Sequence, residues 1–365
     1  MYKIAIDARE SGTGTGRYID KLIENLYELQ PSYKIVLIAK PSRMDYLKRI
    51  APKYQIVETK TKEFTFSEQT KYYTQIQELG VDLVHFGMIQ QPVLYRGKVV
   101  TTMHDLTTTR FENPSKNWLI FKTKQIVYKW VSKIVARKSV AIITPSEFVK
   151  DDVAKFAHIN SRKVTVTYEA ADKITEASKP VDNIAENDEF IMYVGRPTPH
   201  KNLEKLIDAF VMLKVTHPDL KLVLVGKQDV LYKRLERRVQ AAAIPNVIFT
   251  GFTSEGQLRW LYEHTAAYAF PSLSEGFGLP AVEAMTHGAP VASSNATSLP
   301  EILGDAPEYF DPTDPFDMAS AIARIIDNPT HAKELRARSL SQVKKYSWKR
   351  MAEQTIAVYR DILGE

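Results

Sequence analysis

The sequence predicts an α/β protein made of two doubly wound domains, each a parallel sheet covered by helices on both faces. Three observations support this fold class. The 365 residues are too many for one ordinary core and suit two domains of roughly 170 residues each. Short apolar runs alternate with amphipathic stretches, as in parallel strands covered by helices. The alternation stops at a polar segment over 173–189, which reads as a linker, and then begins again.

The first predicted domain covers residues 1–173 and contains six apolar runs of strand length. A glycine-rich turn follows the first run and leads into an amphipathic helix over 17–29, whose apolar residues recur at helical spacing. Helical segments separate most of the other runs. The six predicted strands lie within residues 2–8, 34–39, 81–86, 98–105, 140–146 and 163–168.

The second predicted domain, residues 174–346, repeats this pattern. Ligands of doubly wound sheets bind at the carboxyl ends of the strands, so we expect a binding cleft where two such domains face each other. The predicted strands lie within residues 190–195, 221–226, 246–251, 266–272, 289–294 and 308–312, and the predicted helices within 202–214, 229–242 and 254–265.

Composition excludes several classes of protein. The chain has no cysteine, which rules out disulfides, thiolate nucleophiles and cysteine-ligated zinc. No run of 18 apolar residues and no leader pattern is present, so we expect a cytoplasmic protein that does not span a membrane. Residues 1–173 carry 28 basic against 18 acidic residues, whereas residues 174–365 carry 21 against 25. This asymmetry predicts an anionic partner for the first half, with ordinary surface charge as the alternative.

Residues 274–285, SEGFGLPAVEAM, place Glu275 and Glu283 on either side of a glycine-containing turn. Pro280 suits the first turn of a helix, so the preceding loop lies at a helix N-terminus, where free N–H groups favour an anion. Carboxylates beside such a site suit hydroxyl groups. A molecule with both phosphate and hydroxyls, such as a sugar nucleotide, fits this arrangement; a capping loop with two solvated glutamates is the alternative.

A second cluster follows the strand predicted over 190–195. Arg196 and Lys201 lie five residues apart in a proline-containing turn, where two cations at the carboxyl end of a strand suit a diphosphate. Surface charge is again the alternative. The chain has no Asp-x-Asp and no His and carboxylate cluster at metal spacing, so we expect no metal and no other cofactor at this site.

These motifs resemble the carboxyl half of the family 4 retaining glycosyltransferases, which have the two-domain GT-B fold. The matching stretches are GRPTPHKNLEKLIDAF, PSLSEGFGLPAVEAMTHGAPVASS and SLPEILGDAPEYFDP. In the amino half, TGTGRYIDKLIENL and TMHDLTTTRFENP resemble the branch that includes O-antigen mannosyltransferases. The resemblance implies a GT-B fold and a nucleotide-sugar donor, with the last helix, 347–365, crossing back onto the amino domain.

The resemblance also implies roles for individual residues. Glu275 would contact the transferred sugar, Glu283 would hold the ribose, and Arg196 with Lys201 would stabilise the departing diphosphate. His104 would reach the donor sugar from the amino domain; a structural histidine at a strand end is the alternative. Backbone donors and close approach to the donor would come from Gly276, Phe277, Gly278, Leu279, Gly195, Gly14 and Gly16. The loop with Gly12, Gly14 and Gly16 departs from the family's Gly-Gly form and is a weak dinucleotide signal.

Residues 113–140 suggest how the acceptor is reached. They contain no acidic residue and combine Trp118, Phe121, Tyr128 and Trp130 with the basic residues Lys116, Lys122, Lys124, Lys129, Lys133, Arg137 and Lys138. A basic, aromatic helix suits an anionic membrane surface. We therefore expect peripheral docking at the inner face of the cell membrane; a domain helix with buried aromatics and solvated lysines is an equal alternative.

The resulting hypothesis is a retaining transferase that moves a hexose, with mannose from GDP-mannose the favoured donor, to a hydroxyl of a growing or lipid-linked glycan. A UDP- or ADP-sugar donor and a sugar-nucleotide epimerase or hydrolase are the alternatives. A nicotinamide-dependent oxidoreductase would need a better fingerprint than Gly12 to Gly16. A nucleic-acid module would leave Glu275 and Glu283 unexplained, so no nucleic-acid partner is expected.

Overall fold

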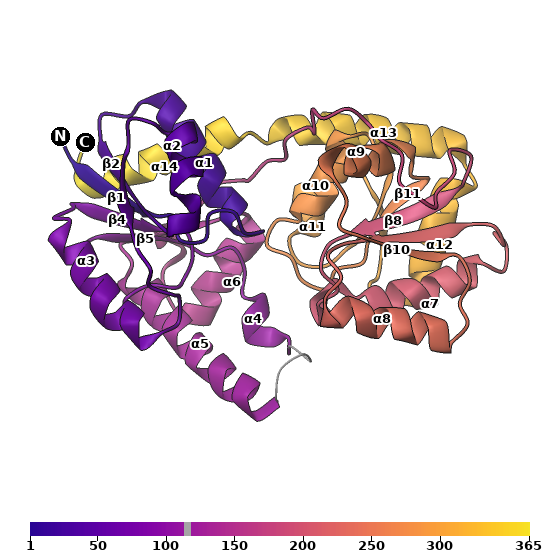
Figure 1. Cartoon of the computed structure of the whole chain (residues 1–365), viewed down its shortest axis with the longest axis horizontal. Helices are drawn as coiled ribbons and strands as arrows, with labels where there is room; N and C mark the ends of the chain where they lie inside the picture. Colours follow the sequence, from indigo (N-terminus) through magenta and orange to yellow (C-terminus); the bar gives the residue numbers. More distant parts are fainter. Residues whose placement is uncertain (113–117) are drawn as a thin grey trace. The chain divides into compact units, whose positions relative to one another are not determined.

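The structure is a computed structural model that describes residues 1–112 and 118–365 and divides into two compact units. Unit 1 comprises residues 1–109, 123–169 and 347–365, and unit 2 comprises residues 110–122 and 170–346. Each unit contains one parallel sheet with helices on both faces (Figure 1). The predicted α/β class with two doubly wound sheets is therefore confirmed.

Unit 1 has a seven-stranded sheet in the order β3-β2-β1-β4-β5-β6-β7. The chain builds outward from β1 on one side and then returns to place β4 on the other side of β1. The strand order reverses between β1 and β4, and the carboxyl ends of these strands are where doubly wound sheets bind ligands. The strands are β1 (Lys3–Asp7), β2 (Lys34–Ala39), β3 (Gln55–Glu58), β4 (Leu83–Phe86), β5 (Val99–Thr102), β6 (Ala141–Thr144) and β7 (Val164–Val166).

The helices of unit 1 include the last helix of the chain. In this last helix, α14 (Trp348–Leu363), Tyr359 is buried, and its hydroxyl lies 2.6 Å from Nδ1 of His85 on β4. The helices are α1 (Gly16–Leu29), α2 (Met44–Ile50), α3 (Tyr73–Glu78), α4 (Thr107–Arg110), α5 (Trp118–Lys138), α6 (Glu147–Ala157) and α14 (Trp348–Leu363), with the short turns η1 (Pro41–Arg43) and η3 (Ser161–Lys163) and the π-helix η2 (Glu68–Tyr72).

Unit 2 has a six-stranded sheet in the order β10-β9-β8-β11-β12-β13. Here the order reverses between β8 and β11. The strands are β8 (Phe190–Val194), β9 (Lys221–Val225), β10 (Val247–Gly251), β11 (Ala267–Phe270), β12 (Val291–Ser294) and β13 (Glu308–Phe310). The helices are α7 (Leu203–Leu213), α8 (Val230–Ala241), α9 (Glu255–His264), α10 (Leu279–Thr286), α11 (Leu299–Leu303), α12 (Pro315–Ile326) and α13 (Pro329–Gln342), with the turns η4 (Pro199–Lys201) and η5 (Val343–Lys345).

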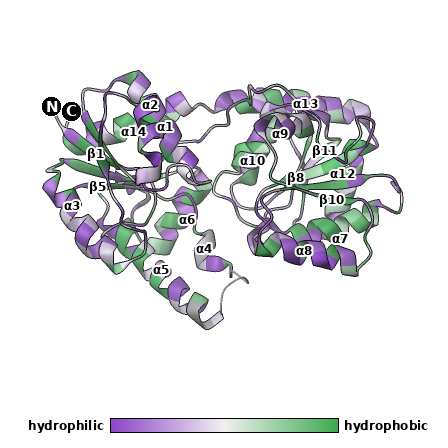
Figure 2. Ribbon diagram, viewed as in Figure 1, coloured by the Kyte–Doolittle hydropathy of each residue, from purple (hydrophilic) through white to green (hydrophobic). Residues whose placement is uncertain are grey.

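The interior of each unit is formed by the strands and the inward faces of the helices, where hydrophobic residues concentrate (Figure 2). Strands β4, β5, β11 and β12 are buried at every position, which explains why their apolar runs predicted them. The sequence missed β3. Among the described strands, this edge strand pairs with β2 alone, and it is half exposed, so its sequence, QIVE, lacks the long apolar run of a central strand.

Candidate functional site

The loop at the start of α10 is shaped by Gly278. Its φ is 90°, a left-handed conformation that side chains rarely adopt, and a Cβ there would lie 2.7 Å from Leu299. Helix α10 then begins at Leu279, with Pro280 in its first turn. Pro280 has no N–H, and the N–H groups of Ala281 and Val282 donate to the carbonyl of Gly278. The local sequence thus builds the helix N-terminus that was predicted as an anion site.

Glu275 and Lys201 lie together although 74 positions separate them in the chain. Lys201 Nζ is 2.5 Å from Glu275 Oε1, and the two side chains are 18% and 11% exposed. The glutamate backbone is held as well, because its carbonyl accepts from the hydroxyls of Thr297 (3.2 Å) and Ser298 (2.9 Å). Two residues predicted to contact the sugar and the diphosphate therefore form one ion pair at the carboxyl edge of the sheet in unit 2.

Arg196 does not share this pair. Its Nε lies 2.5 Å from Asp229 Oδ2, and its side chain is 60% exposed. Asp229 is the N-cap of α8, where its other oxygen accepts from the backbone N–H groups of Leu231 and Tyr232. Burial alone would raise the pKa of Asp229, but these hydrogen bonds and the nearby guanidinium lower it. The two predicted diphosphate-binding cations are thus each paired with a separate carboxylate.

Glu283 lies in the middle of α10, half-buried. Its backbone carbonyl is 3.0 Å from Nδ1 of His287, whose Nε2 accepts from the backbone N–H of Ile174. These contacts fix the neutral tautomer of His287, with the proton on Nδ1. Burial also lowers the pKa of His287 to about 4. This neutral imidazole therefore has a structural role, because it links α10 to the segment around Ile174 by hydrogen bonds.

The predicted glycines differ in how much the fold requires them. At Gly16, the first residue of α1, a Cβ would lie 1.6 Å from the carbonyl oxygen of Glu10, so no side chain fits. At Gly14 a Cβ would meet nothing within 4 Å, so the fold leaves open space beside this backbone. Gly195 follows β8 and precedes Arg196, while Gly276 and Phe277 precede the α10 turn, with the Phe277 ring buried against Tyr346.

His104 follows β5 in unit 1, and both of its ring nitrogens already have acceptors. Nδ1 lies 3.0 Å from Glu169 Oε1, and Nε2 lies 3.0 Å from the carbonyl oxygen of Gly87. An imidazole that donates from both nitrogens is an imidazolium. Burial opposes this charge, but the hydrogen bond and charge of Glu169 prevail, and the pKa of His104 is raised. A donor sugar could contact Nε2 of His104 only if the hydrogen bond from Nε2 to the Gly87 carbonyl broke.

Comparison with known proteins identifies the family. A family model described as Glycosyltransferase Family 4 matches residues 12–173, and one described as Glycosyl transferases group 1 matches residues 174–342. The chain belongs to the family 4 glycosyltransferases. It is therefore a retaining glycosyltransferase of the hexosyltransferase class, and the resemblance predicted from its sequence motifs is confirmed.

Relatives of this glycosyltransferase include the O-antigen chain mannosyltransferase B of Escherichia coli. The two are 28% identical over 276 residues, which is 72% of this chain and 70% of the relative. Among solved structures, sucrose-phosphate synthase from Thermosynechococcus elongatus superposes with a TM-score of 0.78 at 19% identity, covering all of both chains. Anabaena HepE in complex with UDP and glucose gives 0.74 at 16% identity over 99% of this chain and all of that one. These likenesses confirm the GT-B fold.

Sequence reasoning missed two carboxylates of the glycosyltransferase, Asp229 and Glu169, which bind Arg196 and His104. Asp229 is the first residue of the helix predicted over 229–242 and caps α8 after β9, and Glu169 directly follows the strand predicted over 163–168. A carboxylate at the carboxyl end of a parallel strand is the signal that could have found them.

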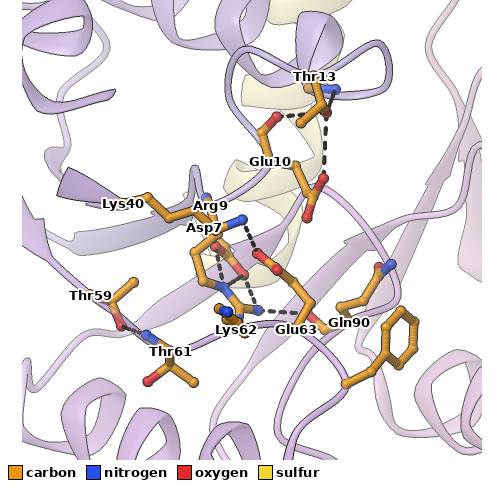
Figure 3. A network of polar contacts seen from close by, with 12 residues as sticks. Asp7, Arg9, Glu10, Thr13, Lys40, Thr59, Thr61, Lys62, Glu63 and Gln90 are labelled. Atoms are coloured by element: carbon orange, nitrogen blue, oxygen red, sulfur yellow. Dashed lines mark hydrogen bonds and ion pairs between the residues drawn. The ribbon is translucent and has the colours of Figure 1, made fainter. Parts of the chain in front are cut away.

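Sequence reasoning also missed a charged network at the carboxyl end of β1 in unit 1 (Figure 3). Buried Arg9 donates to Asp7 (2.7 Å) and to the carbonyl of Gln90 (3.0 Å), and its Nη1 lies 2.8 Å from Glu68. Its guanidinium also lies over the ring of Tyr72. This residue therefore ties the end of β1 to the π-helix η2 and to the loop after β4.

The edge of this network holds two more carboxylates beside a lysine. Lys40 Nζ is 2.7 Å from Glu63 Oε1. Burial and the neighbouring carboxylate of Glu63 raise the pKa of Glu10. Burial alone would also raise the pKa of Glu63, but the hydrogen bond from Lys40, a backbone hydrogen bond and the charges of Lys40 and Arg9 together lower it. Within residues 1–112 and 118–365, no three His, Asp or Glu side chains gather as metal ligands do, and no helix is long and apolar enough to cross a bilayer.

Proposed function

We propose that this enzyme transfers a mannosyl residue from GDP-mannose to a hydroxyl of a growing or lipid-linked glycan, with retention at the anomeric carbon and without a metal. The ion pair of Lys201 and Glu275 is the observation that supports the proposal, because a cation suited to phosphate and a carboxylate suited to hydroxyls lie 2.5 Å apart. The mannose follows from the relative named as a mannosyltransferase. The UDP bound to the structural relative keeps a UDP-sugar as the alternative donor.

The chemistry assigned to unit 2 is electrostatic. When the donor binds, its diphosphate takes the position of the Glu275 carboxylate as the partner of Lys201, and Glu275 turns to the sugar hydroxyls. As the bond between sugar and phosphate breaks, negative charge grows on the departing diphosphate, where Lys201, Arg196 and the N-terminus of α10 stabilise it. The departing phosphate oxygen accepts the proton of the incoming acceptor hydroxyl, so no separate base is required. Glu283, one turn into α10, binds the ribose.

A donor panel tests this proposal. The enzyme is incubated with GDP-mannose, UDP-glucose, UDP-galactose and ADP-glucose, each with p-nitrophenyl α-mannoside as the acceptor and with EDTA. We expect an α-linked product from GDP-mannose, identified by the anomeric coupling in its NMR spectrum. A β-linked product or complete loss of activity in EDTA would contradict retention or metal independence, and a product only from UDP-sugars would replace the donor.

The acceptor side of the proposal places the enzyme at an anionic membrane through α5. Trp118 and Trp130 are 63% and 62% exposed, whereas Phe121 and Tyr128 face the core. Along α5 the exposed Trp118, Ile126 and Trp130 each lie three or four residues from one of the basic residues Lys122, Lys129 and Lys133. Tryptophan and lysine together favour an anionic interface. Residues 113–117 of the predicted segment lie outside the described residues.

Vesicle sedimentation tests this docking. We expect the wild type to sediment with vesicles of phosphatidylglycerol and phosphatidylcholine, but not with phosphatidylcholine alone, and to be released by high salt. Trp118→Ser with Trp130→Ser should remain in the supernatant. Phe316→Ser is the matched control, because Phe316 is 69% exposed on α12 in unit 2. Equal sedimentation of the double variant and the wild type would contradict this role for α5.

A further inference from the structure

We propose that a cavity at the amino edge of the sheet in unit 1 binds a saccharide that carries an acidic group. The cavity has a volume of about 300 Å³ and lies between α1, the start of β2 and the start of β3. This volume is at the lower end of the range for small-molecule sites. Its lining combines aromatic, amide and cationic side chains: Tyr27, Gln30, Tyr33, Lys34, Lys53, Tyr54 and Gln55, with Pro31 and Ile35.

The cavity is separate from the carboxyl edge of the same sheet. Lys34 is the first residue of β2 and Gln55 is the first of β3, so the cavity lies where these parallel strands begin. Lys40 and His104 follow the ends of β2 and β5. A strand of six residues spans roughly 20 Å. A ligand in the cavity therefore leaves the residues at the carboxyl edge of unit 1 free.

Charge indicates an anionic ligand. Lys34 and Lys53 are exposed, and neither forms an ion pair within the described parts of the chain. The cavity lining includes no acidic residue. Glu365 lies close to this face, but its carboxylate accepts from the Tyr33 hydroxyl at 3.0 Å and is thereby engaged. Two unpaired ammonium groups at one small cavity suit a phosphate or a carboxylate.

The tyrosines indicate a ring with both apolar and polar faces. The rings of Tyr27 and Tyr54 meet edge to face, with centroids 5.3 Å apart. Tyrosine offers an apolar ring and a hydroxyl from one rigid side chain, which suits the mixed surface of a hexose. The Tyr54 hydroxyl is buried and has no hydrogen-bond partner among the described residues. Gln30 and Gln55 add amides that can donate to and accept from sugar hydroxyls.

Together these groups suit a hexose that carries a phosphate or a carboxylate. This choice of ligand rests on the proposed function, because a glycosyltransferase encounters such sugars. Two sources share this chemistry: a free sugar phosphate, and an acidic sugar within the glycan that is being extended. In either case the saccharide binds at the amino edge of the sheet in unit 1 and not at the site of transfer.

Calorimetric titration tests the site with four probes: mannose 1-phosphate, glucuronic acid, methyl α-mannoside and inorganic phosphate. We expect both acidic sugars to bind about tenfold more tightly than the neutral sugar or phosphate alone, since a hydrogen bond to a charged group adds about 1.5 kcal/mol or more. Lys34→Ala with Lys53→Ala should remove that tenfold preference. Tyr27→Leu should weaken both acidic sugars, while Lys71→Ala, an exposed lysine of unit 1, is the control.

The source is then read from the tighter probe. A fifth probe, a disaccharide that ends in glucuronic acid, completes this comparison. Tightest binding by mannose 1-phosphate indicates a free sugar phosphate, and tightest binding by the disaccharide indicates a glycan. Lys201→Met should leave this binding unchanged, which separates it from the donor site. Failure of both acidic sugars to bind, or equal binding by the Lys34→Ala, Lys53→Ala variant, would overturn the proposal. Transfer from GDP-mannose is measured separately and does not depend on this outcome.

Discussion

Replacing Glu275 by glutamine should separate nucleotide binding from sugar transfer. Lys201 Nζ lies 2.5 Å from Glu275 Oε1, so a donor diphosphate must compete with this carboxylate for the lysine. The glutamine keeps the shape of the side chain and removes its charge. We expect the variant to bind GDP as well as the wild type or more tightly, and to lose transfer by about a hundredfold or more, as when one key polar contact to a transition state is removed.

The size of the binding effect follows from the burial of the pair. Two unit charges about 4 Å apart interact by about 4 kcal/mol at an effective dielectric constant of about 20. Both side chains of this pair are partly exposed, and each loses hydration when they pair, which offsets much of the attraction. A net coupling of about 1 kcal/mol then remains, or about a fivefold tightening of GDP in Glu275→Gln.

Isothermal titration with GDP and a transfer assay with GDP-mannose measure the two effects on the same preparation. Lys201→Met should weaken GDP about tenfold or more, because it removes a charged hydrogen-bond donor. Lys205→Met is the matched control, since Lys205 is exposed on α7 and has no ion pair within the described residues. Full transfer by Glu275→Gln, or unchanged GDP affinity in Lys201→Met, would refute this account of the site.

Three further predictions concern the other charged contacts. Arg196→Ala should weaken GDP about tenfold in the same titration while lowering the free energy of unfolding by about 1 kcal/mol or less, because its pair with Asp229 is exposed; a larger loss of stability with no loss of GDP affinity would contradict it. The pKa of His104 is raised, so its charged form stabilises unit 1 fully at pH values below the ordinary histidine pKa. This contribution to the free energy of unfolding is lost as pH rises through the raised pKa. Thermal melts should therefore show a fall in stability over that range that is absent in Glu169→Gln, and parallel curves would contradict the imidazolium. His287 has the opposite effect on stability, because its pKa is lowered to about 4. The free energy of unfolding should decline as pH falls from about 6.5 towards 4. An NMR titration in which His287 protonates at about pH 6.5 would contradict a neutral, buried imidazole.

The fold was largely predictable because its strands are buried on both faces. The apolar runs at 34–39 and 190–195 contain β2 and β8, and the sequence 17–29 contains nearly all of α1. Among the strands of residues 1–112 and 118–365, the sequence failed to predict only β3, because a half-exposed edge strand is not required to be apolar along its length. The family was also readable from the sequence, since its motifs are long continuous stretches in a fixed order, as the matches over 12–173 and 174–342 confirm.

Which charged side chains pair with each other, by contrast, was decided only by the tertiary structure. Arg196 and Lys201 are neighbours in the sequence, yet they pair with Asp229 and Glu275, each brought to the same sheet edge by a different strand. The sequence likewise contains four aromatic residues in α5 without showing which of them face solvent; packing buries Phe121 and leaves Trp118 and Trp130 exposed. Helical and strand patterns depend on local periodicity, which a sequence displays directly. The pairing and exposure of side chains depend on which distant elements pack together, and that is fixed only when the sheets form.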